Sequence, residues 1–316
     1  TPIGSLVLVL HSHLPYVLTH GRWPHGLDWL NEAAAETYIP LLNVFNALVE
    51  EGHSPKLTIG ITPVLAEQLA DDFFKQEFLS YLEAKIEAAK EDKIAFTRTG
   101  QEGLARTARF WVEWYTKIKH DFTTTYRQDI LKAFRGLQDA GHIEIITCGA
   151  THGYFPLLSL DTSIQAQVKV AIATHQKHFG RAPRGIWLPE CAYRPAYDWR
   201  LPTGADSSAP AYPRKGVEEF LSENGLDFFF IDSALLKGGK VLGVYIERFE
   251  GLKRIWQQFQ EQVKERPEDF TKSPYELYLV NSSGKPEKKP VGVFTRDPRT
   301  ALQVWSGEHG YPGDGW

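Results

Sequence analysis

The sequence predicts an α/β fold built on parallel strands, of the barrel type with insertions. Apolar runs of strand length alternate with segments of helical periodicity, and polar and aromatic residues gather directly after several of these runs. A strand–helix–strand order implies parallel pairing through a right-handed crossover. A length of 316 residues is ordinary for one α/β barrel that carries insertions.

The first predicted strand–helix–strand unit lies near the N-terminus. Residues 5–10 form a run of mostly Val and Leu that is typical of a buried strand. Residues 31–50 carry apolar side chains at helical spacing and are followed by Gly52, a signal for the end of a helix. Residues 56–61 are the second predicted strand.

A long helical region interrupts this alternation. From residue 63 to about 132 the pattern is helical, charged and rich in aromatics, which is too long for a single crossover helix. We interpret residues 66–125 as an inserted, mostly helical subdomain, and residues 1–65 and 126–316 as the catalytic barrel.

The remaining elements follow in the same alternation. We expect helices at 129–140, 163–179 and 214–225, and strands at 143–148, at 185–190, at 226–232, at 291–295 and at 301–305. Residues 237–290 are charged and contain several Pro, with one helix-like stretch at 251–265. We interpret them as an irregular excursion over the barrel mouth.

Composition excludes several classes of partner. The net charge of −4, with 42% hydrophobic and 23% charged residues, indicates a soluble globular protein without the basic excess that attracts nucleic acid or anionic membranes. The apolar run at 3–10 is too short to span a membrane and lacks the flanks of a signal peptide. Cys148 and Cys191 each follow an apolar, strand-like run. Thiols in such places are more often buried than joined in a disulfide, which agrees with a reducing compartment. We therefore expect a cytoplasmic location.

The number and placement of aromatic residues indicate a class of ligand. Nine Trp and thirteen Tyr occur, many beside Gly or Pro rather than inside periodic runs. Rings on loops suit stacking against sugars or bases, and the absence of basic clusters favours sugars. Four rings are candidates for sugar platforms, although single rings of this kind are more often part of the core: Trp187, Trp305, Tyr311 and Trp316.

Glu190 is the strongest candidate for a catalytic group. It follows the apolar run 185–188 and stands between Pro189 and Cys191. Chemistry in α/β folds collects at the carboxyl ends of strands, where this carboxylate is predicted to lie. Two structural alternatives remain open from position alone: Glu190 could cap the next helix or pair with Arg194.

Histidines follow two other predicted strands. His11 and His13 are two residues apart and point the same way if the chain stays extended, and His152 follows the strand 143–148. They could form a three-His metal site. No Asp accompanies the pair, so we favour histidines that bind sugar hydroxyls, followed by purely structural ones, and expect neither metal nor cofactor.

Two further polar groups have less specific interpretations. Cys191 is expected to be a wall of the site rather than a nucleophile, because no His lies at a helpful local spacing. Asp232 ends a strand-like run, and the residues after it favour a helix N-cap over a second catalytic carboxylate.

Four motifs in order together resemble glycoside hydrolase family 57, and within it the α-1,4-glucan branching enzymes. They are His11-Ser12-His13-Leu14-Pro15-Tyr16, Gly149-Ala150-Thr151-His152-Gly153-Tyr154, Trp187-Leu188-Pro189-Glu190-Cys191-Ala192-Tyr193, and Leu302-Gln303-Val304-Trp305-Ser306 with Gly310-Tyr311-Pro312-Gly313.

The resemblance implies an incomplete (β/α)7 barrel, an inserted helical subdomain, a C-terminal helical domain and a retaining mechanism on α-glucans. Glu190 falls on the family's nucleophile, and His11, His13, His152, Cys191 and Trp305 fall on substrate-contact positions. The acid/base of the family is an Asp downstream of the Gly-Tyr-Pro-Gly loop, and no position before Trp316 matches it. We therefore expect the molecule to continue beyond this residue.

Several functions remain open at this point. Within the family, the alternatives to a branching enzyme are an α-amylase and a 4-α-glucanotransferase. Outside it, the alternatives are a metal-dependent polysaccharide deacetylase on a similar barrel and a non-catalytic glucan-binding fragment.

Overall fold

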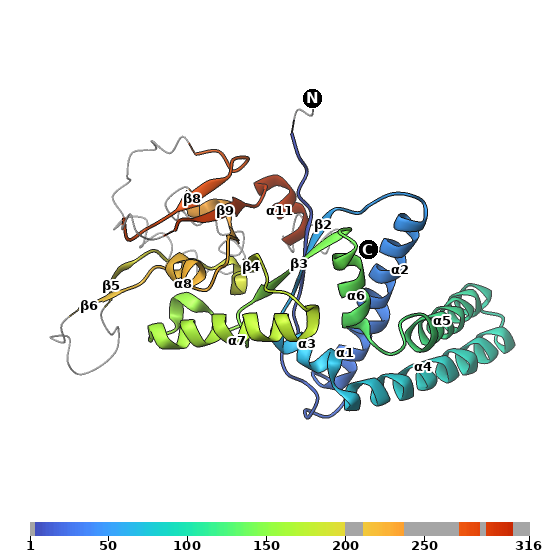
Figure 1. Ribbon diagram of the computed structural model, residues 1–316. Helices are drawn as coiled ribbons and strands as arrows, with labels where there is room; N and C mark the ends of the chain where they lie inside the picture. Colours follow the sequence, from blue (N-terminus) through green and yellow to red (C-terminus); the bar gives the residue numbers. More distant parts are fainter. Residues whose placement is uncertain (1–3, 200–210, 237–271, 285–288, 306–316) are drawn as a thin grey trace, which may run out of the picture. The chain divides into compact units, whose positions relative to one another are not determined.

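The computed structural model describes residues 4–199, 211–236, 272–284 and 289–305 (Figure 1). The chain divides into two compact units, each described here by itself. Unit 1 comprises Thr1–Gly153 and Thr162–Trp187, and unit 2 comprises Tyr154–Asp161 and Leu188–Trp316.

Unit 1 contains four parallel strands in the order of the chain. They are β1 (Val9–Ser12), β2 (Leu57–Ile61), β3 (Ile143–Cys148) and β4 (Gly185–Trp187). The parallel pairing predicted from the strand–helix order is therefore confirmed. β1 begins four residues later than predicted, and its first paired residue, Val9, lies opposite Thr58 of β2.

The helices follow the predicted order with shifted ends. α1 (Leu27–Ala33) runs through a π-helical turn (Ala34–Tyr38) into α2 (Ile39–Glu50). The others are α3 (Pro63–Ala70), α4 (Asp72–Arg98), α5 (Glu102–His120), α6 (Ile130–Asp139) and α7 (Asp161–Phe179). Within the described ranges no helix combines the length and apolar character needed to cross a membrane.

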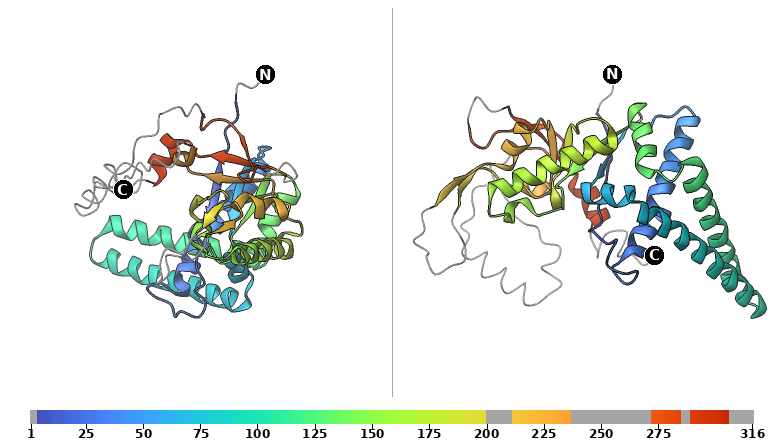
Figure 2. Two further views of the ribbon diagram at one scale, coloured as in Figure 1. Left: turned by 90° about the vertical axis from the view of Figure 1, so that its left-hand side faces the viewer. Right: turned by 60° about the horizontal axis from the view of Figure 1, so that its bottom comes forward.

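α4 and α5 form a helical hairpin in which the two helices lie side by side (Figures 1 and 2). Asp71 caps α4 by accepting a hydrogen bond of 2.8 Å from the backbone N–H of Phe73. Gly100, with φ of +71°, makes the reversal between the helices. The hairpin lies inside the segment 66–125, whose status as an inserted subdomain stays a prediction.

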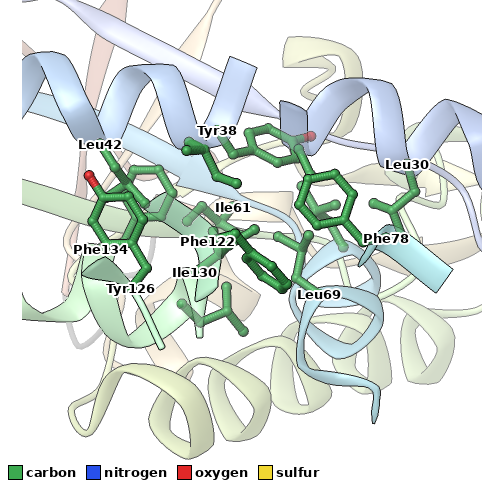
Figure 3. Packing of buried hydrophobic residues seen from close by; sticks show 14 of the residues in the cluster. Leu30, Tyr38, Leu42, Ile61, Leu69, Phe78, Phe122, Tyr126, Ile130 and Phe134 are labelled. Carbon is green, nitrogen blue, oxygen red and sulfur yellow. The ribbon is translucent and has the colours of Figure 1, made fainter. Parts of the chain in front are cut away.

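The core of unit 1 is formed where the helices pack on β2 and β3. Figure 3 shows buried side chains from the helices meeting Ile61 at the end of β2. Phe78 of α4 packs edge-on against Phe122, with ring centroids 4.9 Å apart. Large fully buried side chains of this core include Leu30, Ile39, Leu42, Ile59, Phe74, Phe78, Phe122 and Phe134.

The described residues of unit 2 contain two small groups of strands. β5 (Tyr197–Trp199) and β6 (Tyr212–Arg214) are antiparallel, β7 (Phe228–Ile231) and β9 (Val291–Thr295) are parallel, and β8 (Tyr278–Val280) runs antiparallel to β9. The helices described in this unit are α8 (Val217–Glu223), the short α9 (Ser233–Leu236) and α11 (Pro298–Trp305). β8 lies within the segment 237–290 that we interpreted as irregular, and the helix-like stretch 251–265 is outside the described residues.

The strand predicted at 301–305 is wrong, because these residues belong to helix α11. Asp297 starts the helix: its carboxylate accepts hydrogen bonds from the backbone N–H groups of Arg299 and Thr300, at 3.1 and 3.3 Å. Pro298 occupies the first helical position, where its missing N–H costs nothing. An Asp-Pro helix start therefore outweighs the apolar residues that suggested a strand.

Candidate functional site

Three histidines meet at the carboxyl ends of β1 and β3 in unit 1. We call His11, His13 and His152 the imidazole cluster. The rings of His13 and His152 stack with centroids 3.8 Å apart, and His11 lies 5.9 Å from His152 and 5.1 Å from the ring of Trp187. The structure thus brings together four predicted site residues of unit 1.

Gly60 of β2 provides the space in which His11 lies. It pairs in register with His11, and a Cβ built at Gly60 would come within 2.8 Å of His11 Nδ1. A side chain at this position would push the imidazole away. The ring can therefore reach across β2 toward β3 only because the intervening strand carries glycine.

The loop that carries His152 is fixed by Gln167 of α7. The Gln167 side chain accepts a hydrogen bond from the Thr151 backbone N–H at 2.9 Å and donates one to the Thr151 hydroxyl at 2.7 Å. His152 itself has φ of 59°, an uncommon conformation for a residue with a side chain. The helix thus holds the loop in the form that directs this imidazole.

Two imidazoles of the cluster are kept neutral. Burial lowers the pKa of His11 to about 3, with further contributions from His152 and His13. The pKa of His13 falls to about 4 through burial and then through His152. Neutral imidazole both donates and accepts hydrogen bonds, as a sugar hydroxyl does. His13 Nδ1 already lies 3.2 Å from the hydroxyl of Thr62.

The structure also changes the set of possible metal ligands. The group whose ligand atoms all lie within 4.8 Å of one another consists of His11, Cys148 and His152, and His13 is not in it. Cys148 is the last residue of β3 and is fully buried. Among the described residues, the three histidines considered from the sequence do not lie together within this distance.

In unit 2, Glu190 lies on a short 3-10 turn, Pro189–Cys191, which we call the Glu190 turn. Glu190 and Cys191 both adopt left-handed backbone conformations, with φ of 59° and 53°. Such conformations in non-glycine residues cost about 1–3 kcal/mol each and concentrate at functional sites. The Glu190 side chain is exposed, whereas Cys191 is buried.

Cys191 is unsuited to act as a nucleophile. Burial raises the pKa of its thiol to about 12, opposed by the nearby Arg296 and reinforced by the charges of Asp232 and Glu190. Only the thiolate attacks carbon efficiently. Its expected role as a wall of the site stays a prediction.

Asp232 and Arg296 form an ion pair at the carboxyl ends of β7 and β9. Asp232 also accepts a hydrogen bond of 2.9 Å from the Ala234 backbone N–H, so the predicted capping of the next helix is confirmed. Arg296 was not singled out from the sequence. Its position directly after β9, matching that of Asp232 after β7, is a signal that could have found it.

A buried carboxylate connects the chain after the Glu190 turn to the segment after β8. Glu218 is only 2% exposed and accepts hydrogen bonds from the Tyr193 hydroxyl at 2.9 Å and the Ser282 backbone N–H at 2.8 Å. The Ser282 hydroxyl also donates to Glu218 and accepts from the Ala196 N–H at 2.7 Å. We call these residues the Glu218 network; the sequence contained no signal for it.

The remaining predicted residues have less definite positions. Arg194, the alternative partner of Glu190, pairs with Asp161 at 3.4 Å and donates to the Lys215 carbonyl at 2.6 Å. Trp305 is the last residue of α11, and its side chain lies outside the described residues, as does all of Tyr311.

Comparison with known proteins places these motifs in one family. Residues 7–314 match the model of glycosyl hydrolase family 57. The chain is 41% identical to a 1,4-alpha-glucan branching enzyme of Thermococcus kodakarensis over 313 residues, which are 99% of this chain and 41% of that protein.

Two solved structures are similar in fold and sequence. A GH57-type branching enzyme from Pyrococcus horikoshii matches with a TM-score of 0.79 and 39% identity, over 99% of this chain and 50% of that one. The alpha-amylase AmyC from Thermotoga maritima matches with a TM-score of 0.70 and 30% identity, over 98% of this chain and 49% of that one. The chain thus spans half or less of each relative's length, and the predicted α/β fold is confirmed.

Proposed function

Because the chain belongs to glycosyl hydrolase family 57, we propose that its protein is a retaining α-glucan transglycosylase, specifically a 1,4-α-glucan branching enzyme. The observation that carries this proposal is 41% identity to a branching enzyme across nearly the whole chain. The exposed carboxylate of Glu190, on a strained turn, supports the same chemistry.

In this proposal Glu190 attacks the anomeric carbon and forms a glycosyl-enzyme. Retaining enzymes need a second carboxyl group, about 5–5.5 Å from the first, that protonates the leaving oxygen and then deprotonates the acceptor. Asp232 does not suit this role, because it pairs with Arg296 and caps α9. By the family resemblance, the acid/base is instead an Asp downstream of the Gly-Tyr-Pro-Gly loop.

The imidazole cluster and the neighbouring rings would bind the glucan. Neutral His11 and His13 can hydrogen-bond sugar hydroxyls without bringing a charge into the site. Trp187, which stacks on His11, adds an aromatic surface in unit 1. By the resemblance and the aromatic pattern, Cys191, Trp305 and Tyr311 remain candidates for contact with the glucan.

The fate of the glycosyl-enzyme decides among the family's activities. Transfer to a glucan 6-hydroxyl makes an α-1,6 branch, whereas transfer to water shortens the chain. The similarity to the Thermotoga maritima alpha-amylase makes hydrolysis the second candidate. Walls that bind the acceptor and exclude water favour transfer.

The products formed from amylose test the proposal. The full-length protein is incubated with amylose, and new α-1,6 linkages are counted by debranching while reducing ends are counted in parallel. A branching enzyme produces α-1,6 linkages with few new reducing ends. Reducing ends without branches would instead establish an α-amylase, and longer linear chains a 4-α-glucanotransferase.

We also propose a cytoplasmic location, with an α-glucan as the partner and neither nucleic acid nor membrane. Two buried thiols that do not form a disulfide support a reducing compartment. The net charge of −4 supports the absence of polyanionic partners.

A further inference from the structure

We propose that His11, Cys148 and His152 form a binding site for a borderline-soft divalent transition metal ion such as Zn²⁺. Occupation of this site would block glucan binding, a consequence that rests on the proposed function. The site differs from the three-His arrangement of a hydrolytic metal centre, because a thiol replaces His13.

The geometry suits a small ion. The ligand atoms of the three residues lie within 4.8 Å of one another. A tetrahedral Zn²⁺ with bonds of about 2.0–2.3 Å holds its ligands roughly 3.3–3.8 Å apart, so the atoms need to approach by at most ~1.5 Å. Rotation of the imidazoles about χ2 can provide this movement, since Gly60 leaves the space beside His11 open.

The chemistry of the ligands points to the same class of ion. Both ring nitrogens of His11 are buried and have no hydrogen-bond partner among the described residues, which leaves a neutral donor whose lone pair is uncommitted. Two imidazoles and one thiol are ligands that Zn²⁺ and Co²⁺ bind well, whereas Mg²⁺ and Ca²⁺ prefer oxygen. On binding, the Cys148 thiol releases its proton to solvent and the thiolate bonds to the ion.

The site is reachable and lies on the proposed glucan-binding residues. Cys148 and both ring nitrogens of His11 are buried, whereas His152 is partly exposed, so an ion would enter beside His152. An ion bound to His152 would fix the ring that stacks on His13, and both histidines are proposed to contact the glucan. Metal and glucan would therefore compete.

Absorption of Co²⁺ tests the site independently of activity. The full-length, reduced, metal-free protein is titrated with Co²⁺, and we expect one equivalent to produce a thiolate-to-cobalt charge-transfer band in the near ultraviolet. Cys148→Ser should abolish this band, and His11→Gln should weaken Co²⁺ binding at least tenfold. Cys191→Ser is the matched control, because it removes the other buried cysteine and should leave the band unchanged.

The possible outcomes separate the two proposals. No band in the wild type, or a band that survives Cys148→Ser, overturns the metal site. A band without Zn²⁺ inhibition of glucan transfer overturns the competition and supports the site alone. A band in a protein without activity on amylose supports the site and overturns the proposed function. If Cys148→Ser does not fold, a band of unchanged strength and affinity in His11→Gln overturns the site.

Discussion

The imidazole cluster of unit 1 and the Glu190 turn of unit 2 are positioned by different forces. In unit 1, neutral rings are held by stacking, by the space at Gly60 and by a loop fixed through Gln167. In unit 2, the chain around Glu190 is held by carboxylates and guanidinium groups: the Glu218 network, and the pairs Arg296–Asp232 and Arg194–Asp161. Neutral groups suit the binding of sugar hydroxyls, whereas the charged groups of unit 2 fix the chain that carries Glu190.

The largest expected effect is on activity, and it separates the chemical role of Glu190 from the stability of the charged groups that hold its turn. Glu190→Gln should lower both glucan transfer and hydrolysis by at least about 10³-fold, because it removes the proposed nucleophile. Thermal unfolding should change little, since the side chain is exposed. Glu223→Gln, which changes an exposed carboxylate at the end of the mostly buried α8, is the matched control.

Chemical rescue sharpens this test. With azide and an activated α-glucosyl donor, Glu190→Ala should yield a β-glucosyl azide, because azide attacks once from the face that the carboxylate left open. Near-normal branching by Glu190→Gln would show that another residue is the nucleophile.

The next largest effect tests the charged frame of unit 2. Glu218→Ala should lower the free energy of unfolding by about 3 kcal/mol, because it leaves the Tyr193 hydroxyl and the Ser282 N–H without their acceptor. Urea unfolding measures the change. Glu218→Gln keeps one acceptor oxygen and should cost less; equal stability of all three proteins would mean that the network contributes nothing.

The neutral histidines of the imidazole cluster predict that the free energy of unfolding depends on pH. A histidine with a pKa near 6.5 when unfolded and about 3 when folded takes up its proton first in the unfolded state. Stability should therefore fall as the pH falls from 6.5 toward 3. For His11 this is about 2 kcal/mol between pH 6.5 and 5, and His11→Gln should remove that part of the decline in urea unfolding.

His175 separates stability from function in the same experiment. Burial, followed by Arg181 and His178, lowers its pKa to about 3, but it packs against Phe179 of α7 rather than in the imidazole cluster. His175→Gln should flatten the pH profile as His11→Gln does and leave glucan transfer unchanged. If His175→Gln and His11→Gln lose glucan transfer to the same extent, the loss in His11→Gln reflects folding rather than glucan binding.

The sequence predicted the parts of the molecule that depend on local pattern. The strand 143–148 and the helices around it follow from apolar periodicity, and the family motifs contain the cluster histidines and Glu190. The helix at Pro298–Trp305 was missed, although Asp297 and Pro298 signalled its start. The apolar residues at 301–305, which follow β9 along the chain, were interpreted as a further strand instead.

Contacts between distant segments could not be predicted in the same way. Glu218 reads as an ordinary surface residue of a helix, and its burial depends on Tyr193 and Ser282, which are 25 and 64 positions away. Likewise, Cys148 joins His11 only because β2 places Gly60 between them. Such groupings arise from the order of strands and from the space left by small residues, and a single sequence shows neither directly.

The smallest expected effect tests whether hydrogen bonding, in addition to stacking, orients the imidazole cluster. Thr62→Val removes the hydroxyl that lies 3.2 Å from His13 Nδ1 and keeps the shape of the side chain. One neutral hydrogen bond contributes about 1 kcal/mol, so the KM for amylose should rise by about fivefold with little change in kcat. Thr62→Ser restores the hydroxyl and should restore the KM. If Thr62→Val behaves as the wild type, stacking on His152 alone is sufficient to hold His13.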